Sequence, residues 1–74
     1  MTIEYDIFCF NRTLYVTFPE EYEYFESDIL DALGTFYDEW QNSDEGYCCE
    51  EYMIKRLLER YAVLGWESIE WEEE

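Results

Sequence analysis

The stretch PEEYEYFESDILDALGTFYDEWQN, residues 19–42, decides the fold that we expect for this chain. Apolar side chains recur through its second half at the helical period, and acids occupy the other side. The apolar stripe consists of Ile29, Leu30, Leu33, Phe36, Tyr37 and Trp40. The opposite arc consists of Asp28, Asp31, Thr35, Asp38, Glu39 and Asn42. We therefore predict a helix over residues 28–41 that packs its stripe against a core.

The segment before this helix, residues 20–26, has two readings. Pro19 followed by acids suits the start of a helix, whereas Ser27 and Asp28 offer a separate N-cap. We expect a short helical turn or an ordered loop here. Within the helix, Gly34 costs about 1 kcal/mol relative to Ala, and we expect it to permit a close approach by the N-terminal strands.

The residues before Pro19 alternate as a β-hairpin does. Residues 2–10 form the first predicted strand, with Ile3, Tyr5, Ile7 and Cys9 on one face. Asn11 and Arg12 form the turn. Residues 13–18 form the second strand, with Leu14, Val16 and Phe18 on one face.

The residues after Asn42 predict a second helix and a third strand. The helix spans residues 47–64, is capped by Ser43 or Asp44 and ends at Gly65. Its apolar arc contains Met53, Ile54, Leu57, Leu58, Tyr61 and Leu64, and its outer arc contains Lys55, Arg56, Glu59 and Arg60.

Residues 66–71 alternate again and form the third predicted strand. The order is ββααβ, an α+β fold in which a small, mostly antiparallel sheet packs against two helices in one domain of residues 1–74. The last strand lies either antiparallel to the second or parallel to the first. Residues 72–74 are a solvated terminus.

Composition favours a folded domain with a basic partner. Of the 74 residues, 22% are aromatic, which is atypical of disordered chains. The net charge of −16 disfavours binding to nucleic acid or anionic membranes, because phosphates are repelled. Basic proteins are the natural partners of such a surface.

The cysteines and the hydropathy pattern predict a cytoplasmic protein. Adjacent Cys48 and Cys49 cannot bridge each other without strain, and Cys9 leaves the number of cysteines odd. We see no secretory signal and no apolar run near the ~20 residues of a membrane span.

The sequence favours neither catalysis nor a cofactor. It contains no His, the commonest general base and metal ligand, and no Gly-rich phosphate loop. Residues 44–51 lack the order of an EF-hand loop, and Cys48 with Cys49 lacks the spacing of a zinc site. We predict no enzyme activity, no cofactor and no metal.

The acids around the central helix form the candidate partner-binding site. Between Asp28 and Glu39 they extend over about 16 Å at ~1.5 Å per residue. That is roughly one charge per 4–5 Å, close to the ~3.4 Å phosphate spacing of a DNA strand. The predicted partner-binding residues are Glu20, Glu21, Glu23, Tyr24, Glu26, Asp28, Asp31, Asp38 and Glu39. The alternative is that these acids only keep an aromatic-rich domain in solution.

A small, acidic, aromatic-rich chain without His resembles, in overall character, the DNA-mimic inhibitors of phages and mobile elements, which include anti-CRISPR and anti-restriction proteins. These proteins share no single fold or motif. The resemblance implies an inhibitor that occupies the DNA-binding groove of a CRISPR effector or a restriction-type enzyme. The alternative is an adaptor that uses exposed aromatics such as Trp66 and Trp71. Either protein is expected to be a monomer or a homodimer.

Overall fold

Three strands form one antiparallel sheet in the computed structural model, which describes residues 1–7, 10–43 and 46–72. Strand β1 (Thr2–Ile7) pairs with β2 (Arg12–Thr17), and β2 pairs with β3 (Gly65–Glu70). The sheet order is therefore β1-β2-β3. This confirms the ββααβ order and the α+β class. Of the two neighbours left open for the last strand, the structure has the antiparallel one, β2.

The hairpin follows the predicted alternation. Ile3, Ile7, Leu14 and Val16 point inward and are at most 2% exposed. The turn contains Asn11 at φ 53, a left-handed conformation that Asn adopts more readily than most residues.

The strand bounds differ slightly from the prediction. β2 already begins at Arg12, and Phe10 lies outside β1. The predicted positions of Phe8 and Cys9 lie outside the described residues. Phe18 follows β2. Its N–H donates to the Met1 carbonyl at 2.7 Å, and its carbonyl accepts a hydrogen bond from the Met1 amino group at 3.0 Å. These two bonds extend the pairing of β1 with β2 by one residue pair.

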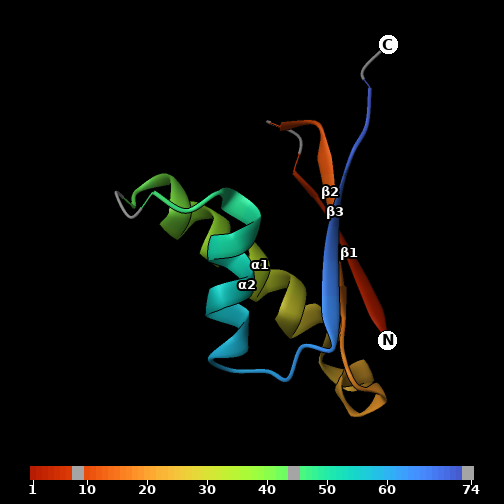
Figure 1. Ribbon diagram of the computed structural model, residues 1–74. Helices are drawn as coiled ribbons and strands as arrows, with labels where there is room; N and C mark the ends of the chain where they lie inside the picture. The colour runs from red at the N-terminus through yellow and green to blue at the C-terminus, as the bar shows by residue number, and fades with distance from the viewer. Residues whose placement is uncertain (8–9, 44–45, 73–74) are drawn as a thin grey trace.

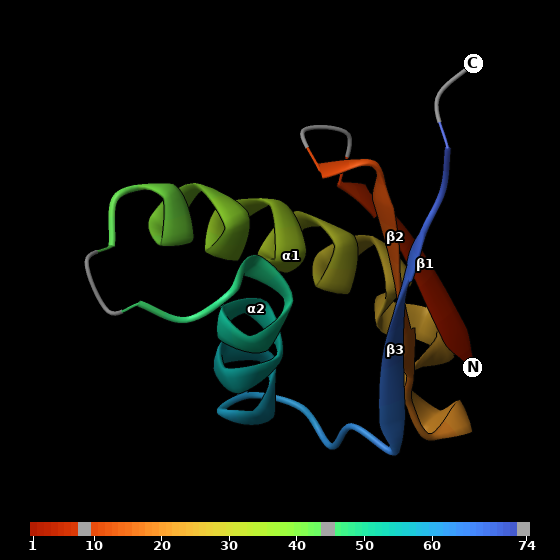
Figure 2. The same cartoon turned by 45° about the horizontal axis from the view of Figure 1, so that its top comes forward.

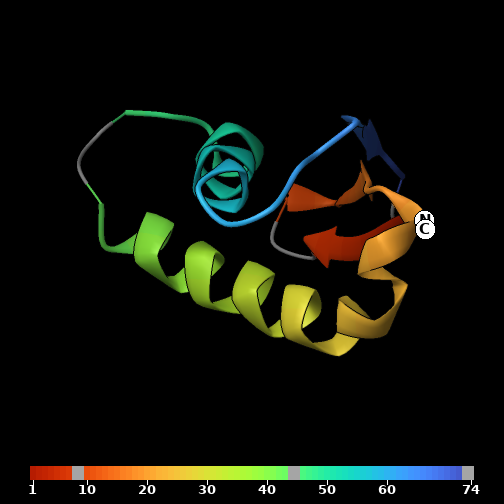
Figure 3. The same cartoon turned by 90° about the horizontal axis from the view of Figure 1, so that it is seen from below.

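Both helices lie on one side of the sheet (Figures 1 and 2). A 3-10 helix, η2 (Glu20–Phe25), leads directly into α1 (Glu26–Gln41), and α2 (Cys49–Leu58) follows a loop. Figure 3 shows α2 nearly end-on while α1 lies across the view, so the two helix axes cross steeply. In the described part of the chain, no helix has the length and apolarity to cross a membrane.

The core lies between the helices and the inner face of the sheet. From α1 it receives Ile29, Leu33 and Phe36, each at most 1% exposed. From α2 it receives Met53 and Leu57, both fully buried. The rest of the predicted α1 stripe packs around this core as partly buried side chains, namely Leu30, Tyr37 and Trp40. The apolar stripe of α1 therefore packs against the core, as the sequence predicted.

The start of α1 differs from the prediction. The helix begins at Glu26, and its N-cap is Phe25, which makes no side-chain cap hydrogen bond. Ser27 and Asp28 are exposed residues of the first turn and not caps. The physical reason is that η2 already runs into α1 in a helical conformation, so no extended cap residue separates them.

The second helix is shorter than the predicted 47–64. It begins at Cys49, with Cys48 as its N-cap, and ends at Leu58. The predicted cap Ser43 lies outside it, and Asp44 is outside the described residues. Leu58 and Leu64 are 56% and 69% exposed and do not continue the buried arc.

The early end of α2 lets the chain return to the sheet. The Leu64 N–H donates to the Thr17 carbonyl at 2.8 Å, and Gly65 is the first residue of β3, not the helix stop that the sequence predicted. If the helix continued to residue 64, no residues would remain to connect the end of α2 to the start of β3. Tertiary closure therefore overrides the apolar periodicity here.

Gly34 is expected to be replaceable by Ala with a gain of about 1 kcal/mol in the free energy of unfolding, the usual helix-interior difference. The hairpin does approach Gly34, but an added Cβ would lie 3.8 Å from the Tyr5 hydroxyl, an ordinary contact distance. Urea denaturation of Gly34→Ala checks this. A loss of stability would show that the helix and β1 pack more closely than this distance indicates.

Candidate functional site

Tyr22 holds η2 against the core. Its half-buried ring contacts Phe18, Tyr61 and Phe25 edge-on, with centroid distances of 6.2, 5.6 and 6.4 Å. Its hydroxyl accepts a hydrogen bond from the Ala62 N–H at 3.4 Å. Aromatic pairs of this kind add about 0.5–1.5 kcal/mol beyond the area that they bury. The segment is therefore anchored although none of its residues is fully buried.

The outer side of η2 presents acids and one aromatic ring. Glu20, Glu21 and Glu23 are exposed. Tyr24 is 92% exposed, more than any other large apolar side chain in the described residues. An exposed Tyr contributes none of the hydrophobic stabilisation that its ring would give if it were buried. Tyr is also one of the residue types that dominate binding hot spots. The structure thus places Tyr24 in solvent beside the carboxylates with which the sequence grouped it.

Carboxylates of α1 continue this surface. Asp28, Asp31 and Asp38 lie on the side of the helix opposite the buried stripe, and Glu26 is its first residue. We define the acidic row as Glu20, Glu21, Glu23, Glu26, Asp28, Asp31 and Asp38, all of which are exposed. Within the described residues, none of their carboxylates takes part in an ion pair. None of these carboxylates makes a capping hydrogen bond at the N-terminus of η2 or α1. The whole row is available to a partner.

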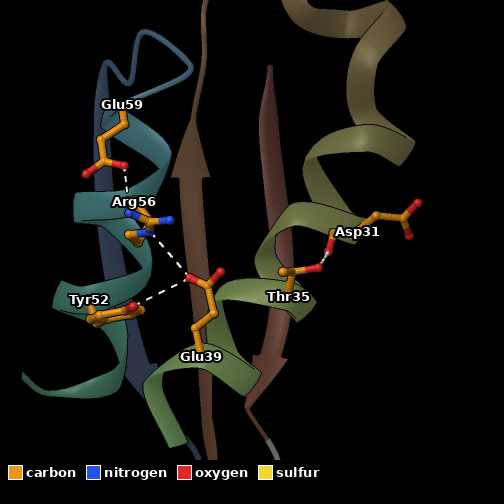
Figure 4. A network of polar contacts seen from close by, with 6 residues as sticks. All are labelled: Asp31, Thr35, Glu39, Tyr52, Arg56 and Glu59. Atoms are coloured by element: carbon orange, nitrogen blue, oxygen red, sulfur yellow. Dashed lines mark hydrogen bonds and ion pairs between the residues drawn. The ribbon is translucent and has the colours of Figure 1, made fainter. Parts of the chain in front are cut away.

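Glu39, also predicted to bind the partner, lies in a different environment. Its Oε2 is 3.4 Å from Arg56 Nε and accepts a hydrogen bond from the Tyr52 hydroxyl at 3.5 Å (Figure 4). Arg56 also pairs with Glu59, at 2.9 Å between Nη1 and Oε2. The steep crossing brings α2 to this end of α1, so the Glu39 carboxylate joins the two helices and lies outside the acidic row.

Glu39→Gln is expected to lower the free energy of unfolding by less than about 1 kcal/mol and to leave partner binding unchanged, because the pair that it removes is partly exposed. Glu23→Gln changes the net charge equally but lies in the acidic row. It is expected to weaken binding without loss of stability. Thermal denaturation and a binding titration of both variants separate the two roles, and equal effects on binding would contradict the distinction.

The cations are kept apart from the acidic row. All four Lys and Arg side chains of the chain lie over aromatic rings, at 4.8–5.7 Å from the ring centroids. Lys55 lies over Tyr47, and Arg56 and Arg60 lie over Phe36. Arg12 lies over Phe10 and pairs with the buried Glu50 at 3.1 Å. Each cation therefore contacts an aromatic ring of the molecule, and none of the ion pairs found among the described residues includes a carboxylate of the row.

The outer face of the sheet is a second exposed surface that the prediction did not include in the site. Figure 1 shows α1 and α2 on the opposite side of the sheet. The strand register places Tyr15 between Glu4 and Glu67 on neighbouring strands. Asp6 also lies on this face and accepts a hydrogen bond from the Thr13 hydroxyl at 2.9 Å. In the sequence, the alternation of inward and outward side chains in each strand, together with the order of the strands in the sheet, is the signal that would have grouped these residues.

A metal site and an activated base place different requirements on the described residues. They contain no group of three or more Cys, Asp or Glu arranged to hold a metal ion. Cys48 is exposed and Cys49 buried, and neither is in a disulfide. Burial raises the pKa of Tyr5, and the nearby Asp38 and Cys49 charges raise it further. This direction keeps the Tyr5 hydroxyl protonated and unsuited to act as a base near neutral pH.

Comparison with known proteins finds no match, whether to a family model, to a curated protein or to a solved structure. The class of the protein is therefore defined by its own fold and surface. It is a small α+β domain that carries an uncompensated acidic row on η2 and α1.

Proposed function

We propose that this protein is a non-enzymatic inhibitor that binds the basic nucleic-acid-binding groove of a host defence protein. A CRISPR effector or a restriction-type enzyme in the bacterial cytoplasm fits this description. One observation carries the proposal: every residue of the acidic row is exposed and makes no ion pair within the described residues, while all four cations lie over aromatic rings of the molecule.

The row is suited to replace a phosphate backbone because it is held on ordered elements. η2 is anchored through Tyr22, and α1 through its buried stripe. The backbone that carries the carboxylates is therefore already ordered, and little conformational entropy of the backbone is lost on binding. A groove that binds phosphates with Lys and Arg would find acceptors at similar spacing, and Tyr24 would offer a ring where DNA offers a base.

The energetic cost of the row also supports a binding role. Carboxylates at neighbouring positions repel one another, and a net charge of −16 on 74 residues opposes the compact state. Part of that cost is offset because Glu26 and Asp28 lie in the first turn of α1, where acids interact favourably with the helix dipole. Asp31 and Asp38 lie beyond that turn and have no such compensation.

The proposal is tested by displacement of DNA from candidate effectors. Labelled duplex DNA is bound to a panel of CRISPR effectors and restriction-type enzymes, and its anisotropy is measured as the protein is added at two salt concentrations. We expect displacement from at least one effector, weaker at the higher salt because charges are screened within about 10 Å at 0.1 M. Unchanged DNA binding across the panel would count against the proposal.

An adaptor that uses exposed aromatics is the second candidate function. The exposed apolar side chains of β3 favour it. Trp66 and Ile69 on this strand are 42% and 48% exposed. Binding through such side chains would be nearly insensitive to salt and would be lost on their truncation to Ala. The salt dependence of binding therefore separates the two functions.

A further inference from the structure

Within residues 1–7, 10–43 and 46–72, no strand pairs with the outer edge of β3. The Trp71 N–H donates to the Asn11 carbonyl at 2.8 Å, and the register of β2 and β3 continues from that pair. In an antiparallel ladder, alternate residues point their N–H and C=O groups at the neighbouring strand. Glu67 and Ile69 therefore face β2, and the backbone groups of Trp66, Ser68 and Glu70 face away from it.

No strand in the described part of the chain lies beyond β3. The sheet order ends there, whereas at the other edge of the sheet β1 contacts α1. Seen from below, α1 and η2 run along the β1 side, and β3 lies at the far side of the sheet (Figure 3). An exposed edge of this kind is a template for an added strand. It is also separate from the acidic row.

The side chains of β3 restrict what can pair with it. Strand alternation places Glu67 and Ile69 on the outer face and Trp66 and Glu70 on the inner face, so each face offers one carboxylate and one apolar group. Trp66, Ile69 and both carboxylates are exposed. Charged residues on an edge strand normally prevent pairing between copies. A second copy is disfavoured here for that reason, since it would bring two acidic strands and two net charges of −16 together.

We propose that the edge of β3 binds an extended basic segment of a partner protein as a fourth strand. Opposite Trp66 and Ile69 the segment carries apolar residues, and opposite Glu67 and Glu70 it carries Lys or Arg. Cross-strand pairs of opposite charge and of apolar groups stabilise a sheet, and the backbone hydrogen bonds supply the rest. Read antiparallel to β3, the recognised pattern is basic, apolar, any residue, basic, apolar.

Ser68 allows a clean test of the backbone pairing. Its N–H points away from β2, so Ser68→Pro removes an edge donor without removing a hydrogen bond of the sheet. Its buried Oγ has no hydrogen-bond partner among the described residues, so loss of the hydroxyl is expected to cost little stability. The matched control is Ser68→Ala, which also loses the hydroxyl but keeps the N–H.

The probe is a capped synthetic peptide that repeats the segment Lys-Val-Thr-Lys-Val, titrated into the full chain and followed by NMR. We expect Ser68→Ala to bind as the wild type does and Ser68→Pro to bind more weakly by on the order of fivefold or more, the effect of one lost hydrogen bond. A peptide with Glu in place of Lys is expected not to bind. Equal affinities of the Pro and Ala variants, when both are folded, would overturn the proposal.

Amide hydrogen exchange gives a readout that does not depend on a variant. The amides of Trp66, Ser68 and Glu70 are expected to exchange quickly in the free protein and slowly with saturating peptide. Those of Glu67 and Ile69 should be protected in both states. If the three edge amides stay unprotected while peptide-induced shifts appear on η2 and α1, the peptide binds the acidic row and the β3 proposal is wrong.

Discussion

Charge reversal in the acidic row is expected to abolish inhibition while the fold is kept. The variant combines Glu23→Lys, Asp28→Lys and Asp31→Lys, which change exposed side chains that form no ion pair with any other described residue. Each reversal replaces an attraction to the basic groove with a repulsion, so three together should weaken binding by about 100-fold or more. The measurement is DNA displacement from the effector by the variant and by the wild type.

The stability of the reversed variant should not fall. Fewer like charges lower the self-repulsion of a chain with net charge −16, and this offsets the lost interaction of Asp28 with the helix dipole, so the melting temperature is expected to stay about the same. The matched control is Glu4→Lys with Glu51→Lys and Glu72→Lys, which changes the net charge equally at exposed positions outside the row. Equal losses of binding in both variants would mean that total charge matters and the row does not.

Phe18→Ala is expected to have the largest effect on stability, a loss of about 3–5 kcal/mol in the free energy of unfolding. Phe18 is fully buried, and its ring contacts those of Tyr22 and Tyr61. Its removal leaves a cavity at the point where the hairpin, η2 and the segment after α2 meet. For a domain at the low end of the range, with a stability of about 5 kcal/mol, this loss would leave only about 0–2 kcal/mol, so a measurable unfolded fraction is expected at 37 °C.

Urea denaturation followed by circular dichroism measures this loss. Phe25→Ala is the matched control, because Phe25 is 46% exposed and its truncation should cost less than about 1 kcal/mol. Since Phe18 supports Tyr22, inhibition by Phe18→Ala should decrease as the folded fraction decreases. A loss of less than 1 kcal/mol for Phe18→Ala would show that the core does not depend on this junction.

The hairpin and α1 could be predicted because the apolar side chains of each element repeat with a single period, that of a strand in the hairpin and that of a helix in α1. Alternation placed Leu14, Val16 and Phe18 inside, and the helical period placed Ile29 and Leu33 there. In both elements the buried face is decided by residues within the element itself. The pattern in the sequence therefore sufficed for these two elements.

The end of α2 could not be predicted in this way. Tyr61 and Leu64 continue the helical period, yet the helix stops at Leu58. The backbone pairing of Leu64 with Thr17, far apart in the sequence, requires the chain to leave the helix. The choice of β2 as the neighbour of β3 has the same origin, because it depends on where the segment from α2 reaches the sheet.

The exposure of the candidate site residues could be predicted where it depends on a single helix and not where two helices meet. The exposure of Asp28, Asp31 and Asp38 follows from the arc opposite the stripe. Glu39 belongs to the same arc, but its environment is set by Tyr52 and Arg56 of α2. Helix crossing is a property of packing between segments, and the placement of the cations over aromatic rings depends on it as well.

The central claim, that the protein occupies the DNA-binding groove of its target, is tested most directly by asking whether DNA and the protein exclude each other. Sedimentation of an effector with labelled DNA and labelled protein measures the complexes that form. We predict two binary complexes and no ternary one, with the apparent dissociation constant of the protein rising in proportion to the DNA concentration. A stable ternary complex of effector, DNA and protein would contradict the claim.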